Sequence, residues 1–162
     1  MDAFIQNEER FDYSDKHYKK LILRFDGACV PTNPNGDMGY GWAIFKEDDD
    51  IVAHGWGYYL FNNQYETSNN IAEWSALYFG AKYLTDNNIL YKDLTIIGDS
   101  ALVINQCNGS WKINKGKPYT FFAELFINEV KPLLNAKTQF MWQRRDNNEY
   151  CDMLSNKFLD NL

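Results

Sequence analysis

Four carboxylates stand at the borders of expected elements of regular structure. Asp26 and Asp99 directly follow short apolar runs, and Glu73 and Asp152 lie in the expected first turns of two helices. Acidic groups at the C-terminal ends of strands in an α/β sheet lie where sites usually form. Carboxylates that converge on one point repel each other, so they require cations between them, and oxygen ligands suit Mg²⁺ or Mn²⁺. Two such ions would support in-line phosphodiester chemistry.

Each acid also has a purely structural explanation. Asn70 and Glu73 have the spacing of a capping box. Asp99 can cap the helix that follows it, and the helix dipole favours Asp152 in a first turn. Asp26 stands before a glycine, as turn residues often do. Spacing by itself does not bring the four acids together, so both explanations stay open at this point.

The hydrophobic pattern predicts a mixed α/β domain with a central sheet. Strands are expected at 21–25, 40–45, 51–60, 94–97 and 138–142, and helices at about 70–84, 101–107, 121–133 and 151–158. Tyr40 and Trp42 alternate along a strand, which favours core packing for both. The acids therefore depend on a sheet and its helices for their positions.

The first 20 residues mix acidic and basic side chains without a clear period. We expect residues 1–20 to be a loosely ordered N-terminal extension and residues 21–162 to be one domain. Alternatively, four apolar residues dock this segment on the domain: Phe4, Ile5, Phe11 and Tyr13.

Composition excludes several classes of protein. The 162 residues fit a single domain, and 16 basic against 22 acidic residues give a net charge of −6. That balance disfavours a protein that coats nucleic acid non-specifically. The mean hydropathy of −0.52 and the lack of an apolar run of about 20 residues exclude a membrane span. With acidic residues near the start, we expect a cytoplasmic protein with no membrane association and no obligate protein partner.

The cysteines indicate no metal or disulfide framework. Cys29, Cys107 and Cys151 are far apart and odd in number, and the sequence has no CxxC pair. We expect reduced, mostly buried thiols and no zinc site.

Four segments carry the four acids in order along residues 21–160. They are FDGAC at 25–29, SNNIAE at 68–73, GDSALVINQ at 98–106 with NGSWK at 108–112, and WQRRDNNEYCDMLS at 142–155. Together these segments resemble the motifs of type 1 ribonuclease H (ribonuclease HI). One such motif is a weak signal, whereas four in the right order are specific.

The resemblance implies a ribonuclease H-like α/β fold, with a five-stranded mixed sheet whose first three strands are antiparallel, flanked by helices. It places the metal-binding, catalytic carboxylates at Asp26, Glu73, Asp99 and Asp152. The implied activity is endonucleolytic hydrolysis of the RNA strand of RNA–DNA hybrids to 5′-phosphate and 3′-hydroxyl products. It also implies two Mg²⁺ ions, for which Mn²⁺ can substitute. One lies near Asp26 and Asp152 and activates water, and the other lies near Asp26, Glu73 and Asp99 and stabilises the leaving oxygen.

The resemblance also implies residues that bind the hybrid. The contacts to RNA 2′-hydroxyls fall on Asn33, Ser68, Asn69 and Asn70. An aromatic residue and three cations are placed to hold the DNA-strand backbone: Trp111, Lys112, Lys115 and Lys117. The alternatives are polar loop residues with a helix cap for the first group, and a solvated loop for the second.

The chain departs from many bacterial members in two ways. It lacks their basic helical protrusion, and no histidine lies between Asp99 and Asp152. Arg144 or Arg145 occupies the shortened loop instead. We assign Arg145 the role of attracting the phosphate electrostatically, since arginine stays protonated and cannot shuttle a proton. The alternative is a surface ion pair of Arg145 with Asp146 or Glu149.

Two other functions remain open. One is a non-catalytic hybrid- or partner-binding domain of the same fold, which the retention of all four acids disfavours. The other is a different nuclease of this fold, such as an exonuclease or transposase-type enzyme, which the SNNIAE and NGSWK segments disfavour.

Overall fold

The computed structural model describes residues 4–14 and 17–161, and within them one mixed sheet has six strands in the order β1-β4-β3-β2-β5-β6. The strands are β1 (Ile5–Arg10), β2 (His17–Val30), β3 (Asp37–Lys46), β4 (Ile51–Tyr59), β5 (Leu90–Gly98) and β6 (Thr138–Trp142). The pairs β1–β4, β4–β3 and β3–β2 are antiparallel, whereas β2–β5 and β5–β6 are parallel. The expected ribonuclease H-like fold is confirmed, with one strand more than expected.

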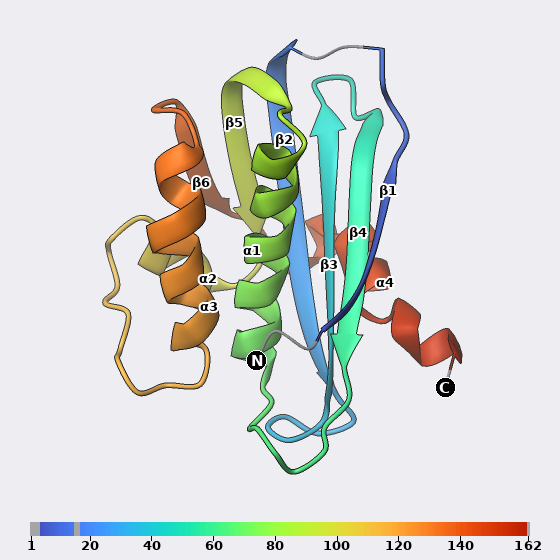
Figure 1. Ribbon diagram of the computed structural model, residues 1–162, viewed down its shortest axis with the longest axis vertical. Helices are drawn as coiled ribbons and strands as arrows, with labels where there is room; N and C mark the ends of the chain where they lie inside the picture. Colours follow the sequence, from blue (N-terminus) through green and yellow to red (C-terminus); the bar gives the residue numbers. More distant parts are fainter. Residues whose placement is uncertain (1–3, 15–16, 162) are drawn as a thin grey trace.

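Helices cover both faces of this sheet (Figure 1). They are α1 (Asn69–Asp86), α2 (Ala101–Cys107), α3 (Thr120–Leu125) and α4 (Glu149–Ser155), with single turns at Arg145–Asn147 (η3) and Lys157–Asn161 (η4). The chain after α3 continues as a π-helical turn, η1 (Phe126–Val130), and a 3₁₀ turn, η2 (Lys131–Leu133). Pro132 in η2 has no backbone N–H, so the helix ends there. Helix α1 packs on one face of β2 and β3, and α4 packs on the opposite face.

Where the structure describes the first 20 residues, an extra strand replaces the expected loose order, and residues 1–3 and 15–16 lie outside the described part. Residues 5–10 form β1, which pairs along the outer edge of β4. Phe4 is buried, and its ring contacts the rings of Tyr40, Tyr59, Phe79 and Phe122 at centroid distances of 5.6 to 5.9 Å. Ile5 is exposed, as are Phe11 and Tyr13. Docking therefore depends on backbone pairing and on Phe4.

Strand β2 also extends further than expected. Its apolar run stops at Phe25, but the ladder with β3 continues to Val30 opposite Asp37. The parallel neighbour β5 ends at Gly98, opposite Phe25. Asp26 therefore lies within β2 at the level where β5 has just ended, which places it beside the first residue after β5.

The core lies between the sheet and α1. Tyr40 and Trp42 are at most 1% exposed, which confirms the core packing expected for them. The three cysteines, all in the described part of the chain, are buried free thiols, as expected. Among the described residues, no helix has the length and apolar character needed to cross a membrane.

Candidate active site

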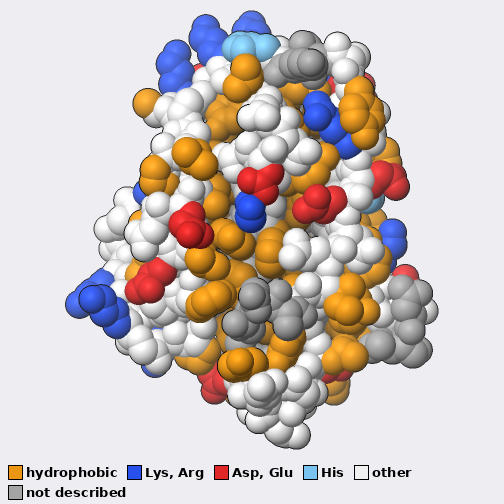
Figure 2. Space-filling model, viewed as in Figure 1, with side chains coloured by type: hydrophobic (Ala, Val, Ile, Leu, Met, Phe, Trp, Pro, Cys, Tyr) orange, Lys and Arg blue, Asp and Glu red, His pale blue; other side chains and the backbone are white. Residues whose placement is uncertain are grey.

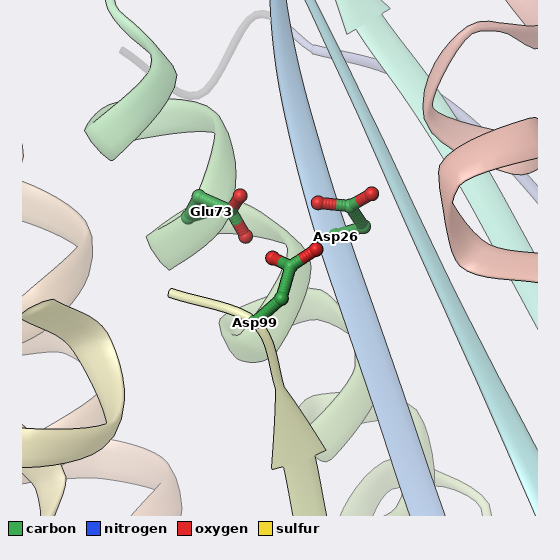
Figure 3. Close-up of side chains that lie close together, drawn as sticks. All are labelled: Asp26, Glu73 and Asp99. Carbon is green, nitrogen blue, oxygen red and sulfur yellow. The ribbon is translucent and has the colours of Figure 1, made fainter. Parts of the chain in front are cut away.

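Three of the four predicted acids meet where β2, α1 and the end of β5 come together. Asp26 lies on β2 and Glu73 on α1, and both are nearly fully buried; Asp99 directly follows β5 and is half-buried. One carboxylate oxygen of each lies within 4.8 Å of the others. Figure 3 shows the three side chains extending into the same space from three different elements.

Close packing of α1 on β2 brings Glu73 to this point. A Cβ atom at Gly27 would overlap the backbone nitrogen of Glu73 and lie 2.5 Å from the carbonyl carbon of Ala72. Only glycine allows this approach without a shift of the helix. The N-cap of α1 is Ser68, whose hydroxyl accepts a hydrogen bond from the Ile71 backbone N–H at 3.2 Å. The capping box with Asn70 is therefore wrong, and Glu73 lies beyond the first turn.

Asp99 is likewise not used as a helix cap. Ser100 caps α2 by accepting from the Val103 N–H at 3.2 Å. The backbone carbonyl of Asp99 accepts a hydrogen bond from Trp142 Nε1 at 3.0 Å, which fixes this residue to the end of β6. The carboxylates of Glu73 and Asp99 are thus free of the structural roles considered for them.

The cluster is electrostatically unfavourable as it stands. Burial, together with the charges of Asp99 and Asp152, raises the pKa of Asp26 to about 7. Burial and the neighbouring charges of Asp26 and Asp99 hold the pKa of Glu73 well above its usual range. Burial also raises the pKa of Asp99, although Arg145 opposes that rise. The buried Glu73 Oε2 has no hydrogen-bond partner among the described residues.

These features fit a divalent cation. A buried carboxylate oxygen without a donor and two further carboxylates within reach form a set of hard oxygen ligands, which Mg²⁺ and Mn²⁺ prefer. A cation there would relieve the repulsion that raises the pKa of Asp26.

Asp152 lies on α4 at the rim of the same cleft, outside the tight group of three. A cleft of about 390 Å³ is lined by all four acids together with Arg145, Asn69 and Asn156. Helix α4 approaches β3 closely at Gly41, where a Cβ would lie 2.5 Å from Leu154 Cβ and 2.7 Å from the Cys151 carbonyl oxygen. Two glycine contacts, on opposite faces of the sheet, thus bring the helices with Glu73 and Asp152 to one site.

Arg145 faces Asp152 rather than the two acids considered in the sequence. Its Nη2 lies 3.6 Å from Asp152 Oδ1, and its side chain is 80% exposed. Nε of the neighbouring Arg144 lies 3.7 Å from Oδ1 of Asp146 instead. Arg145 is therefore the arginine of this loop that lines the cleft.

Two of the predicted RNA-contacting residues are joined by a hydrogen bond. Asn33 Oδ1 accepts from the backbone N–H of Asn69 at 3.0 Å, which links the loop after β2 to the start of α1. Asn69 lines the cleft, and Asn70 is exposed beside it. Ser68 is the helix cap, so the structural alternative holds for its hydroxyl.

The predicted DNA-strand residues lie on the loop between α2 and α3. Trp111 is 48% exposed, and Lys112, Lys115 and Lys117 are exposed as well. Figure 2 shows basic side chains where this loop projects from the body of the molecule. The buried Gln106 anchors the loop: its Nε2 donates to the Lys112 carbonyl and its Oε1 accepts from Trp74 Nε1. Gln106 is the last residue of the GDSALVINQ segment, but nothing in the sequence indicates that its side chain anchors this loop.

Comparison with protein families agrees with this geometry. The family model described as reverse transcriptase-like matches residues 24–158. The uncharacterised protein YpeP of Bacillus subtilis (strain 168) is 32% identical over 96 residues, which are 57% of this chain. The match spans 40% of the length of that relative.

Solved structures match over most of both chains. RNase H1 of the halophilic archaeon Halobacterium salinarum is 29% identical, with a TM-score of 0.72 over 88% of this chain and 99% of the archaeal one. LC11-RNase H1, isolated from compost and solved in complex with an RNA/DNA hybrid, is 25% identical, with a TM-score of 0.73 over 87% and 97% of the two chains. The N-terminal RNase H domain of a Mycobacterium tuberculosis protein, at 22% identity, has the same fold (TM-score 0.72, covering 88% and 95%). The chain therefore belongs to the reverse transcriptase-like family, and its likeness to solved type 1 ribonuclease H structures supports an assignment to that group.

Proposed function

We propose that the protein is an endonuclease that hydrolyses the RNA strand of RNA–DNA hybrids, leaving 5′-phosphate and 3′-hydroxyl ends. The observation that carries this proposal is the buried group of Asp26, Glu73 and Asp99 at the base of an open cleft. The likeness to LC11-RNase H1, which was solved with such a hybrid, supports the choice of substrate.

The same three acids, together with Asp152, are proposed to hold two Mg²⁺ ions, with Mn²⁺ as a substitute. When bound, such ions stabilise the negative charge that develops on the phosphate and on the leaving oxygen. The protein supplies a rigid set of carboxylates whose own repulsion makes cation binding favourable.

Residues in the cleft and on two loops outside it are proposed to position the substrate. The Arg145 guanidinium, exposed beside Asp152, attracts the phosphate with a charge that does not depend on pH in the working range. Asn33, on the loop after β2, and Asn69 and Asn70, at the start of α1, offer donors and acceptors to 2′-hydroxyl groups, which distinguish RNA from DNA. Trp111 and the three lysines of its loop are exposed, and we propose that they contact the DNA-strand backbone.

The experiment that tests this function compares four end-labelled substrates in Mg²⁺: an RNA–DNA hybrid, single-stranded RNA, duplex RNA and duplex DNA. We expect internal cuts in the RNA of the hybrid, loss of cleavage with EDTA and recovery with added Mg²⁺ or Mn²⁺. The Asp26→Asn variant, purified in parallel, controls for contaminating nucleases. Comparable cleavage of duplex DNA, or binding of the hybrid without cleavage, would refute the proposal in favour of a different nuclease or a binding domain.

A further inference from the structure

The loop that carries Arg145 is fastened at both ends. It spans residues 143–148, between β6 and α4, and includes the single turn η3. At its start, the Gln143 backbone N–H donates to the Gly98 carbonyl at 3.0 Å. At its end, the buried Asn148 donates through Nδ2 to the Phe25 carbonyl at 2.8 Å. Arg145 lies between these two anchors.

A third anchor is the side chain of Arg24 on β2, a strand that β5 separates from β6 in the sheet. Arg24 Nη1 donates to Gln143 Oε1 and to the Asn147 backbone carbonyl, both at 3.0 Å. In the parallel ladder Arg24 lies opposite Ile97 of β5, so its side chain reaches past β5 to the loop that follows β6. The two residues that it holds flank Arg145 on either side.

Arg24 has alternatives that it does not use. Three acids line the same surface hollow: Asp49, Asp146 and Glu149. Arg24 nevertheless forms no ion pair with any carboxylate of the described residues. Its guanidinium instead donates from one nitrogen, Nη1, to two neutral oxygens of one loop.

We infer that Arg24 is a positioning residue, which holds the 143–148 loop so that Arg145 stays at the rim of the cleft beside Asp152. Arg24 does not line the cleft itself, so it acts through the loop. The inference rests on the proposed function, because a fixed Arg145 matters only if the cleft receives a phosphate. It adds a residue outside the four motif segments.

A double-mutant cycle with the full-length chain tests this role. Arg24→Gln, Arg145→Ala and the double variant are compared for hybrid cleavage in Mg²⁺, with Lys20→Gln as the control, because it removes the same charge from the same strand. We expect Arg24→Gln to lower kcat by roughly 5- to 20-fold with little change in KM, since a small misplacement of a catalytic group is costly. In the Arg145→Ala background the same substitution should cost less than about twofold, because coupled residues are not additive. Arg24→Lys should recover part of the loss.

Hydrogen exchange gives a readout that does not depend on activity. In Arg24→Gln the amides of residues 143–148 should exchange faster while those of β2 and α1 stay unchanged. If wild-type chain does not cut the hybrid, the proposed function fails, yet exchange still decides whether Arg24 holds the loop. Full additivity in the cycle, or unchanged exchange in this loop, would overturn the inference. Should Arg24→Gln not fold, Gln143→Ala removes one of the two contacts from the loop side and should change kcat and exchange in the same direction.

Discussion

The floor and the rim of the cleft are built differently. The floor consists of Asp26, Glu73 and Asp99, which come from three elements that are packed against one another and exclude most solvent. The rim consists of Arg145 and Asp152, whose side chains are 80% and 40% exposed. A floor residue therefore acts in a fixed, poorly solvated geometry, whereas a rim residue acts through solvent-screened charge. We expect all-or-none effects from the floor and graded effects from the rim.

The largest effect should come from Asp26→Asn. The substitution removes a charge that the cation site requires, so cleavage of the hybrid in Mg²⁺ should fall by more than about 10³-fold. The fold should remain, and the metal-free variant should be more stable because acid repulsion is relieved. Urea unfolding checks the fold, and Asp160→Asn, an exposed acid outside the cleft, serves as the charge-matched control. Near-wild-type cleavage by Asp26→Asn would show that the floor is not the reaction centre.

The pH dependence of stability should also report the floor. Asp26 has a pKa of about 7 in the folded protein and 3.8 as its ordinary value, so between these values the folded state holds a proton that the unfolded state lacks. The contribution of Asp26 to the stability of the metal-free protein should thus fall from about pH 4 to pH 7, by roughly 4 kcal/mol at most, and level off above. The lowered pKa of His54 acts in the opposite direction, so the quantity to measure is the difference between wild type and Asp26→Asn. A difference that does not change between pH 5 and pH 8 would contradict the raised pKa.

Gly27→Ala tests whether packing sets the floor. The added methyl group meets backbone atoms of Ala72 and Glu73, which cannot move aside as a flexible side chain can. We expect a loss of about 2–3 kcal/mol in the free energy of unfolding, together with weaker Mn²⁺ binding. Gly109→Ala is the control: its φ of 76° makes alanine unfavourable, but the new methyl group has open space around it, so about 1 kcal/mol and no change in Mn²⁺ binding are expected.

The smallest effect should come from the rim. Arg145→Ala should lower kcat/KM by roughly tenfold, because an exposed guanidinium contributes through partly screened attraction of the phosphate. Arg145→Lys should recover part of this loss, since the charge remains without the planar fork. Arg144→Ala, the neighbour that lies beside Asp146, should leave the rate within about twofold. Equal rates for the Arg144 and Arg145 variants would contradict the proposal that Arg145 attracts a phosphate beside Asp152.

The sequence predicted the floor better than the way in which it is assembled. The motif segments identified the acids that line the cleft, and the apolar runs located five of the six strands, β2 to β6. The edge strand β1 was missed because nearly all of its side chains are exposed, so it shows no alternation of apolar and polar residues. The continuation of β2 past Asp26 was missed because the apolar run ends at Phe25, although backbone pairing with β3 continues.

The contacts at the rim could not be predicted from the sequence, because they join residues that no local pattern relates to each other. Arg145 lies beside Asp152, seven positions away, whereas the alternative interpretation of the sequence pairs it with its neighbours Asp146 or Glu149. Arg24 and Gln143, which fasten the same loop, are 119 positions apart. Such pairs follow from the strand order, in which β5 separates β2 from β6, and that order is a property of the whole sheet.

Anomalous diffraction from crystals soaked in Mn²⁺ tests the central claim most directly, namely that the floor of the cleft is a divalent cation site. A strong anomalous peak is predicted between the carboxylates of Asp26, Glu73 and Asp99, with any second peak on the side of Asp152. The same soak of Asp26→Asn crystals should lose the first peak. Fully ordered carboxylates with no peak between them at saturating Mn²⁺, or peaks confined to other acids, would contradict the account.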